Sequence, residues 1–286
     1  MKTLDFKAPA KVNLTLEVLG RRPDGYHEIR SVMQTIGLWD RLRLEPGPAI
    51  EYVCRNPGWK LEKSLLPGAV KLLRERTATT RGATIKITKR IPLVSGLGGE
   101  SSLAAAALRG LNQLWELNLS LTDLESLAAR LGSDVTFFLR GGTALAQGRG
   151  EMVTPLAPAP EQGLVLLLPD VPEVPQKTAR LYARLDESHY TRGEMTERLA
   201  SRLGRGVGPL PSMLFNVFDR LAPEVFSGLK DYWQRFIAAG AETVHLAGAG
   251  PALFTLADSK APAEAVYRRL VEQGLKTYLT TTGTFG

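Results

Sequence analysis

The sequence predicts an α+β protein built from two domains, and three observations lead to this expectation. Apolar residues alternate with polar ones from Val12 to Val18, which is typical of a strand with one buried face. Helical segments and further strand-like runs follow one another along the rest of the chain, which indicates an α+β architecture. A proline- and alanine-rich stretch around residues 155–163 marks the boundary between the domains, which we place at 1–157 and 158–286.

The first predicted domain begins with this strand and continues with a turn at residues 21–28, RRPDGYHE, because Pro-Asp-Gly is typical of turns. Pro67 marks the first turn of a helix predicted for residues 63–76, or a break in it. Thr122 and Glu125 form a capping box that opens a second helix, and Gly132 ends it. The runs predicted to be strands are IRSVMQTI, DRLRLE, AIEYVC and ATIKITKRI, with a later hairpin of DVTFFL and GGTALAQG.

The second predicted domain begins with a buried strand, GLVLLLP, at residues 163–169. The run VHLAGAGPALFTL predicts a strand, a glycine turn and a strand, and LKTYLTTT predicts a last strand. Gly240 is expected just beyond the end of a helix, where glycine readily adopts a left-handed conformation. Helices are predicted near residues 176–185, 194–203, 212–221, 229–239 and 262–274.

Residues 92–107, PLVSGLGGESSLAAAA, form the most informative segment of the chain. A β-branched run leads into it and an alanine-rich run leaves it, so we expect a strand, a tight glycine loop and a helix. Glycines let backbone N–H groups approach an anion closely, and the helix behind them presents unpaired N–H groups and a partial positive charge. The segment therefore predicts a phosphate cradle. From the residues alone, an ordinary glycine-rich turn capped by serine is the alternative.

The loop differs from the two commonest nucleotide fingerprints. No lysine follows the glycines, as GxxxxGK[ST] would require, and Ser101 stands at the last glycine of GxGxxG. The sequence also lacks the catalytic-loop and DFG signatures of protein kinases. A nucleotide site in this segment must therefore be of another type.

Composition and charge argue against several other classes. The 286 residues are 44% hydrophobic, which suits one large or two modest domains with an ample core. The single cysteine, Cys54, permits no disulfide within the chain, and the histidines show no zinc-ligand spacing. No apolar run is long enough for a membrane span or a signal core, so we expect a cytoplasmic protein without a membrane partner. The net charge of +7 is scattered, so nucleic acid is not the expected partner.

The loop pattern PxxxGLGGxSSxAAA resembles the ATP loop of the GHMP kinases, which phosphorylate small alcohols. Three further segments strengthen the resemblance, at residues 8–36, 132–151 and 246–254. Together they run in the order of the branch that phosphorylates the 2-hydroxyl of 4-diphosphocytidyl-2-C-methyl-D-erythritol in non-mevalonate isoprenoid biosynthesis. The DGYHE segment favours this branch over mevalonate and homoserine kinases. The resemblance implies a two-domain GHMP kinase fold, with ATP and Mg²⁺ required for the reaction.

The resemblance also implies which residues form the site. Lys11 would orient a carboxylate and stabilise charge on the transferring phosphoryl group, and Asp134 would be the general base for the substrate hydroxyl. From position alone, Lys11 would be a surface lysine on a strand and Asp134 a turn residue that caps the backbone. The ATP-binding residues would be Pro92, Leu93, Val94, Ser95, Gly96, Leu97, Gly98, Gly99, Glu100, Ser101 and Ser102.

The substrate-binding residues implied by the resemblance lie in two segments. Tyr26 would stack on the cytosine ring and His27 would hydrogen-bond its edge, whereas the residues alone indicate an exposed loop tip. Tyr182 would be the second stacking face, and Asn13 would hold the methylerythritol or its phosphate. His245 is expected in the core, and no metal ligand is assigned.

Two residues of the loop and its helix depart from the family pattern. Glu100 stands where most relatives have glycine, and Leu103 where they have aspartate or asparagine. The common Asp-Asn-Leu before the helix near Val70 is also missing. A carboxylate at position 100 would repel nucleotide phosphates unless Mg²⁺ or a lysine intervenes, so Glu100 either points outward or helps to hold the metal. Two alternatives stay open: another GHMP-type kinase for a different small alcohol, and a catalytically inactive binding module. The expected partner is a small molecule, and the chain is expected to be a monomer or homodimer.

Overall fold

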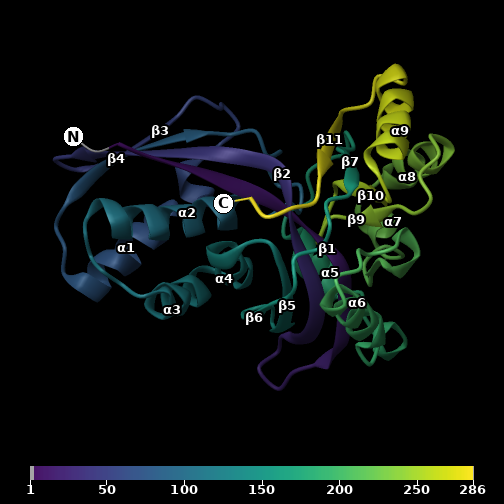
Figure 1. Ribbon diagram of the computed structural model, residues 1–286, viewed down its shortest axis with the longest axis horizontal. Helices are drawn as coiled ribbons and strands as arrows, with labels where there is room; N and C mark the ends of the chain where they lie inside the picture. The colour runs from purple at the N-terminus through teal and green to yellow at the C-terminus, as the bar shows by residue number, and fades with distance from the viewer. Residues whose placement is uncertain (1–2, 286) are drawn as a thin grey trace.

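A computed structural model describes residues 3–285 and arranges their strands in two sheets flanked by helices (Figure 1). The α+β prediction is therefore confirmed. The first sheet has the order β3-β4-β2-β1-β8, and β5 pairs with β2 and with β6. Its strands are β1 (Leu4–Arg21), β2 (His27–Gly47), β3 (Ile50–Cys54), β4 (Gly82–Thr88), β5 (Thr143–Gly148), β6 (Met152–Pro155) and β8 (Phe215–Asn216).

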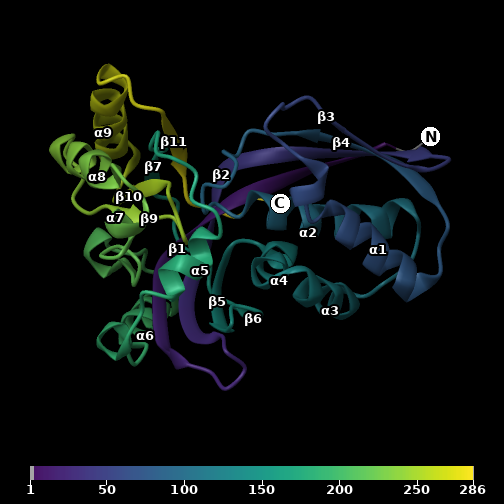
Figure 2. The ribbon, with the colours of Figure 1, turned by 180° about the vertical axis from the view of Figure 1, so that it is seen from behind.

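Helices cover one face of the first sheet and enclose the larger core (Figures 1 and 2). They are α1 (Leu66–Thr77), α2 (Gly99–Leu114), α3 (Leu121–Leu131) and α4 (Ser133–Arg140). The alanine-rich α2 lies directly on β1 and β2, because its small side chains allow close approach to the strands. This packing fixes where α2 begins, and therefore where the glycine loop before it lies.

The second sheet has the order β11-β7-β10-β9 and carries its own core. Its strands are β7 (Gly163–Leu167), β9 (His245–Leu246), β10 (Leu253–Ala257) and β11 (Thr277–Thr281). The helices of this half are α5 (Lys177–Tyr182), α6 (Glu194–Gly204), α7 (Ala222–Val225), α8 (Leu229–Ala238) and α9 (Lys260–Glu272). Helix α9 packs on the second sheet, and α6 packs on β1 and β2 of the first.

The two halves are joined by more than the linker between them. Residues 156–162 connect β6 to β7, but β8 from the second half pairs with β1 in parallel. Near the C-terminus, Gly283 N–H donates to Thr35 O of β2. The two long strands therefore carry contacts with both halves, and the domain division at 157 and 158 remains a prediction.

The first strand is more deeply buried than its alternating pattern predicts. Its polar face, with Lys11, Asn13, Thr15 and Glu17, is buried as completely as its apolar face. The expectation of a half-buried strand is wrong because β8 and α6 pack beside it and the remaining polar face lines a cleft. These buried polar side chains need partners, which points to a site on this face.

Two local expectations about strands are also corrected. The runs IRSVMQTI and DRLRLE belong to one long strand, β2, and not to two. The run DVTFFL is not a strand of a hairpin but most of α4, which lies between Gly132 and Gly141. A short apolar run of this kind cannot be assigned by periodicity alone. Here, Phe137 and Phe138 enter the core from a helix.

Two expectations about helices are wrong as well. The capping box of α3 is formed by Ser120 and Asp123, and not by Thr122 and Glu125. Residues 212–221 do not form a helix. They contain the end of a 3₁₀ turn, strand β8 and a turn, because the Asn216 side chain donates to Leu246 O and Gly248 O and accepts from Phe218 N–H. Such side-chain bonds to the backbone compete with helix formation.

Candidate active site

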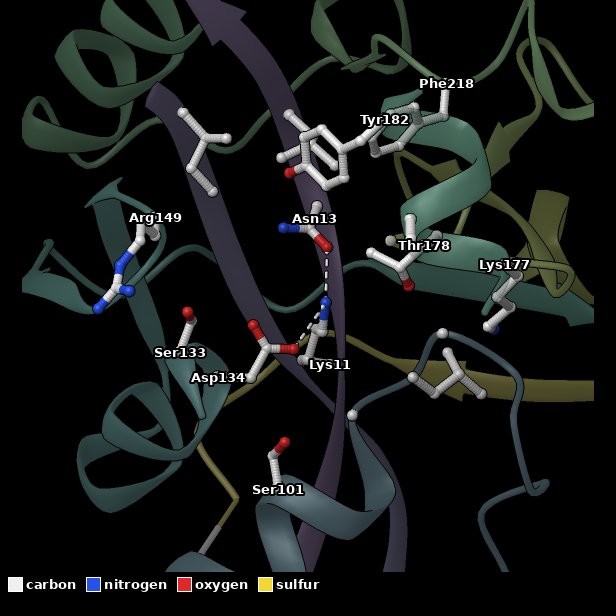
Figure 3. A pocket seen from close by; sticks show the side chains of 18 of the residues that line it. Lys11, Asn13, Ser101, Ser133, Asp134, Arg149, Lys177, Thr178, Tyr182 and Phe218 are labelled. Carbon is white, nitrogen blue, oxygen red and sulfur yellow. Dashed lines mark hydrogen bonds and ion pairs between the residues drawn. The ribbon is translucent and has the colours of Figure 1, made fainter. Parts of the chain in front are cut away.

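A cavity of about 1250 Å³ lies between the two halves and contains nearly every residue singled out in the sequence (Figure 3). It is lined by the glycine loop, the polar face of β1, the start of α4, the turn before β2, and α5. Sequence segments that lie far apart therefore meet in one cleft. The size suits a ligand larger than a simple alcohol.

The glycine loop joins β4 to α2, as the sequence predicts. Gly96 and Gly98 have φ values of +89° and +75°, which glycine adopts without strain. The N-cap of α2 is Gly98, which offers no side-chain cap. Within residues 3–285, the backbone N–H groups from Ser95 to Ser101 donate no hydrogen bond to protein. This row of free donors at a helix N-terminus fits a polyphosphate.

Close packing keeps the loop in this shape. A Cβ atom at Gly98 would lie 2.8 Å from the ring of Phe138 and 3.2 Å from the Lys11 side chain. A Cβ atom at Gly96 would collide with the carbonyl of Ala247 in the second half. All the predicted loop residues line the cavity except Ser102, which is buried behind the loop with its N–H bound to Gly98 O.

Lys11 and Asp134 lie side by side in the cleft (Figure 3). Lys11 Nζ is 3.3 Å from Asp134 Oδ2 and donates to Asn13 Oδ1 at 2.8 Å. Asn13 in turn donates to Ser31 Oγ at 2.7 Å, so the amide is fixed. The lysine is 4% exposed, which contradicts the reading of Lys11 as a surface residue.

Asp134 is placed by α4 and not by a loop before a strand. It occupies the first turn of the helix, where a carboxylate is favoured by the helix dipole. Its side chain keeps 36% of its surface exposed to the cavity while Lys11 beside it is almost buried. The carboxylate is thus oriented by the lysine and still open to a ligand.

The three aromatic residues predicted to bind a base also line the cavity. The ring of His27 stacks on that of Tyr182, with centroids 4.8 Å apart and planes at 24°. Tyr26 is 56% exposed and lies under the guanidinium of Arg149, 4.7 Å from its ring centroid. Phe218 meets the ring of Tyr182 edge-on.

Shifts in pKa keep the rings of Tyr182 and His27 uncharged. Burial, with the nearby charge of Asp134, raises the pKa of Tyr182 to about 12, so its hydroxyl stays protonated. Burial and the charge of Arg21 lower the pKa of His27, so the imidazole is neutral at pH 7. A neutral imidazole offers one donor and one acceptor to the edge of a base.

Glu100 neither points outward nor stands free. Its carboxylate accepts hydrogen bonds from Trp59 Nε1 and Ser64 Oγ, and Lys89 Nζ lies 3.4 Å away. Lys89 therefore offsets the negative charge of Glu100, which would otherwise repel nucleotide phosphates. Leu103 is fully buried in the larger core and lies outside the cavity lining.

The cavity also contains residues that the sequence argument missed. Ser133, Arg149, Lys177 and Phe218 line it, and Lys89 enters behind the loop. Arg149 lies in the segment 132–151 that carried the resemblance, so it could have been found there. His245 is outside the cavity, as expected, and its Nδ1 lies 2.8 Å from Asp219 Oδ2.

No cluster of three or more His, Cys, Asp or Glu side chains suited to a metal lies within residues 3–285. Mg²⁺ commonly binds through one or two carboxylates together with phosphates of the substrate and water. The cavity offers Asp134 beside the free amides of the loop. One carboxylate, with phosphates bound at the loop amides, fits a metal that arrives with a nucleotide.

Comparison with known proteins gives the family. The model of the GHMP kinase N-terminal domain matches residues 64–142, and that of the GHMP kinase C-terminal domain matches residues 194–276. A 4-diphosphocytidyl-2-C-methyl-D-erythritol kinase of Dehalococcoides mccartyi is 47% identical over 98% of both chains. One from Geobacillus kaustophilus is 40% identical over 93% of this chain and 92% of that one. The chain belongs to the 4-diphosphocytidyl-2-C-methyl-D-erythritol kinases of the GHMP family.

Solved structures agree with this 4-diphosphocytidyl-2-C-methyl-D-erythritol kinase assignment. A crystal structure of 4-(cytidine 5'-diphospho)-2C-methyl-D-erythritol kinase superimposes with a TM-score of 0.82, at 34% identity over 98% of this chain and 99% of that chain. Homoserine kinase from Cytophaga hutchinsonii, at 20% identity, shares the fold with a TM-score of 0.72 over 100% of this chain and 96% of that chain. The family and kinase predictions are confirmed, and neither alternative function is favoured. As a GHMP kinase, the chain uses a nucleotide, in agreement with the free amides of the loop.

None of the helices in the part of the chain that the structure describes is long and apolar enough to cross a membrane. Whether the enzyme is a monomer or a homodimer stays a prediction.

Proposed function

We propose that this enzyme transfers the γ-phosphoryl group of ATP to the 2-hydroxyl of 4-diphosphocytidyl-2-C-methyl-D-erythritol. The observation that carries the proposal is the placement of the Lys11–Asp134 pair between two different subsites of one cavity. The free amides of the glycine loop form one subsite, and the aromatic group of Tyr26, His27 and Tyr182 forms the other. A phosphate donor and a base-containing acceptor can meet at the pair.

The loop supports the binding of ATP. The amides from Ser95 to Ser101 would donate to the β- and γ-phosphates, and the α2 N-terminus would favour their negative charge. Mg²⁺ bound with the nucleotide would neutralise charge on the phosphate oxygens, and Asp134 is a carboxylate that lines the same cavity and could help to hold it.

The Lys11–Asp134 pair supports the chemical step. Asp134 would accept the proton of the 2-hydroxyl as its oxygen attacks the γ-phosphorus, so that a new O–P bond forms and the bond to ADP breaks. Lys11 orients the carboxylate and would stabilise charge on the phosphoryl group during transfer. Phosphoryl transfer depends mainly on positioning and electrostatics, which these two groups and the loop supply.

The aromatic residues support recognition of the cytidine. The rings of Tyr26 and Tyr182 would stack on the base, and the neutral His27 would hydrogen-bond its edge. Asn13, fixed by Lys11 and Ser31, would hold the methylerythritol part near Asp134.

A substrate panel tests the proposal. Release of ADP is measured with ATP and Mg²⁺ in the presence of 4-diphosphocytidyl-2-C-methyl-D-erythritol, its uridine analogue, mevalonate, homoserine or no acceptor. We expect release above background with the cytidine compound and much less with the others. Equal or greater release with mevalonate or homoserine would show that this cavity serves a different alcohol.

A further inference from the structure

Lys177 connects the glycine loop to the second half of the protein. It is the first residue of α5, and its ammonium donates to Val94 O of the loop at 2.7 Å. It also donates to Gly250 O, in the turn between β9 and β10. The side chain lines the active-site cavity and reaches toward the loop from the side opposite Asp134 (Figure 3).

The partners of this ammonium are unusual because both are neutral. Within residues 3–285, no carboxylate oxygen lies within ion-pair distance of Lys177 Nζ. A mostly buried cation is ordinarily paired with an anion, since losing its water is unfavourable. Two carbonyl groups satisfy part of its hydrogen bonding but leave its charge uncompensated. An anion bound in the cavity would compensate it.

The contact with Val94 acts on the most strained residue of the loop. Val94 has φ +52°, and a β-branched side chain in the left-handed region costs of the order of 1–3 kcal/mol. Such a conformation persists only where surrounding contacts hold it. The hydrogen bond from Lys177 to the carbonyl of Val94 is a contact of this kind.

The same contact sets the direction of a backbone amide in the loop. In a planar trans peptide, the C=O and the next N–H point to opposite sides. Since Lys177 binds the carbonyl of Val94, the N–H of Ser95 points away from Lys177. That N–H is one of the loop donors without a protein acceptor in the described residues. Lys177 thus fixes the orientation of the Val94–Ser95 peptide within the loop.

The charge state of Lys177 responds to its surroundings near neutral pH. Burial and the nearby charge of Lys11 on β1 lower its pKa to about 7, and Glu173 before α5 opposes this. Asp134 on α4, which also lines the cavity, is paired with Lys11, and Glu100 on α2 is paired with Lys89. A polyphosphate beside the loop would favour the charged ammonium and raise its pKa again.

We propose that Lys177 is a positioning residue for the nucleotide, which holds the loop in its anion-binding conformation and places a positive charge beside it. The inference rests on the proposed binding of ATP at the loop. Nucleotide binding should then be coupled to proton uptake by Lys177. Nucleotide affinity is highest at pH values below the pKa of Lys177 in the free enzyme. It falls as pH rises above that pKa, and it levels off above the pKa of Lys177 in the nucleotide complex.

The test is calorimetric titration of the whole enzyme with Mg²⁺ and a non-hydrolysable ATP analogue between about pH 6.5 and about pH 9. For the wild-type enzyme, we expect the Kd to increase about tenfold over this range, which corresponds to one unit of pKa shift. The variant Lys177→Met should bind about tenfold more weakly at the lowest pH and show little of this pH dependence. In two buffers of different ionisation enthalpy, proton uptake should be seen for the wild type and be lost in Lys177→Met.

Two further variants isolate the effect of Lys177. Arg180→Met removes a positive charge from the exposed side of the same helix, and its Kd should follow that of the wild type at every pH. Lys177→Arg keeps a charge that does not titrate in this range, so its Kd should stay close to constant. Titration of the analogue itself is common to all variants and cancels in the comparison.

The possible outcomes separate the two claims. If Lys177→Met keeps the wild-type Kd, pH profile and proton uptake, the role of Lys177 is wrong while the nucleotide site stands. If Lys177→Met fails to fold, the wild-type enzyme is compared with Lys177→Arg instead. Profiles of Kd against pH that coincide for these two proteins up to about pH 9 would equally overturn the role of Lys177. Absence of any analogue binding to the wild-type enzyme would instead contradict the proposed nucleotide site.

Discussion

Lys11 Nζ lies 3.3 Å from Asp134 Oδ2, which joins the centre of β1 to the first turn of α4. The lysine is buried and also held by Asn13, whereas the carboxylate stays open to the cavity. The cation holds the carboxylate in place, and the carboxylate stays within reach of a hydroxyl bound in the cavity, which is the geometry that a general base needs.

The first prediction concerns this pair. Asp134→Asn keeps the shape of the side chain but removes its charge and its capacity to accept a proton. We expect kcat to fall about 10²–10⁴-fold with a modest change in the KM for ATP, measured by steady-state ADP release. A kcat close to that of the wild type would make Asp134 a structural residue.

The two residues should also act as a unit. Lys11→Met fills similar volume without the charge, and its kcat should fall by a similar factor. The double variant should lose less than the product of the two single losses, because each residue works through the other. Fully multiplicative losses would indicate that Lys11 and Asp134 act independently.

The second prediction concerns Gly98. An alanine there would be strained by the φ of +75° and would crowd Phe138 and Lys11. Gly206 has a similar φ of +72°, but no atom lies within 4 Å of a Cβ at that position. Both Gly→Ala variants should lose about 1–2 kcal/mol of unfolding free energy from backbone strain, measured by urea titration. Gly98→Ala alone should lose further unfolding free energy, because its Cβ crowds Phe138 and Lys11. It alone should also raise the KM for ATP, by about tenfold or more. Unchanged ATP kinetics in folded Gly98→Ala would count against the phosphate cradle.

The third prediction concerns the aromatic subsite. Tyr182→Ala and Tyr26→Ala should each weaken binding of the cytidine substrate about tenfold to a hundredfold, which is the usual effect of losing a stacked ring. Tyr182→Phe keeps the ring and should resemble the wild type, since no hydrogen bond of the Tyr182 hydroxyl is found in the described residues. The KM for ATP should stay the same in all three variants.

His27 should contribute selectivity more than stacking strength. His27→Ala removes a partner for the base edge, so the ratio of kcat/KM for the cytidine substrate over its uridine analogue should decrease. If neither His27→Ala nor Tyr26→Ala changes the KM of the cytidine substrate, the proposed acceptor is wrong.

The fourth prediction concerns the base of the loop, where Lys89 and Asp40 form a buried ion pair at 2.5 Å. Lys89→Met would leave a carboxylate buried without its cation and should cost about 3–5 kcal/mol of unfolding free energy near pH 7. Lys86→Met removes a lysine whose partner Glu45 is on the surface, and it should change stability little.

The pH dependence of this loss has a definite sign. Burial raises the pKa of Asp40 even with Lys89 present, and loss of the lysine would raise it further. The loss of unfolding free energy in Lys89→Met should therefore be largest at pH values above the raised pKa of Asp40. It should shrink as pH falls through that pKa, because a protonated Asp40 buries no charge. A deficit independent of pH would point to lost packing instead.

Local chemistry explains what could be predicted from the sequence. The glycine loop and α2 follow from glycine, serine and alanine at adjacent positions, so residues 92–107 were assigned correctly. The motifs around Asp134 and Lys11 single out both residues, and the structure places their side chains side by side. The burial of Lys11 does not follow from its position, because it depends on Gly98, Gly248 and Asp134, which are distant in sequence.

Tertiary contacts explain what was missed. The run DVTFFL fits either a strand or a helix, and packing of Phe137 and Phe138 on the larger core decides for α4. Lys177 lies at the start of a helix that the sequence predicts, but nothing in that segment indicates what its side chain contacts. Its meaning depends on Val94 and Gly250, which fold against it from two other parts of the chain.

The most direct test of the proposed reaction is ³¹P NMR of its product. The wild-type enzyme, ATP, Mg²⁺ and 4-diphosphocytidyl-2-C-methyl-D-erythritol should give one new phosphomonoester signal, coupled to the 2-position of the methylerythritol, in equal amount to ADP. Asp134→Asn, at the same concentration and time, should give almost none. Formation of ADP without this phosphomonoester, or a phosphomonoester at another hydroxyl, would contradict the account.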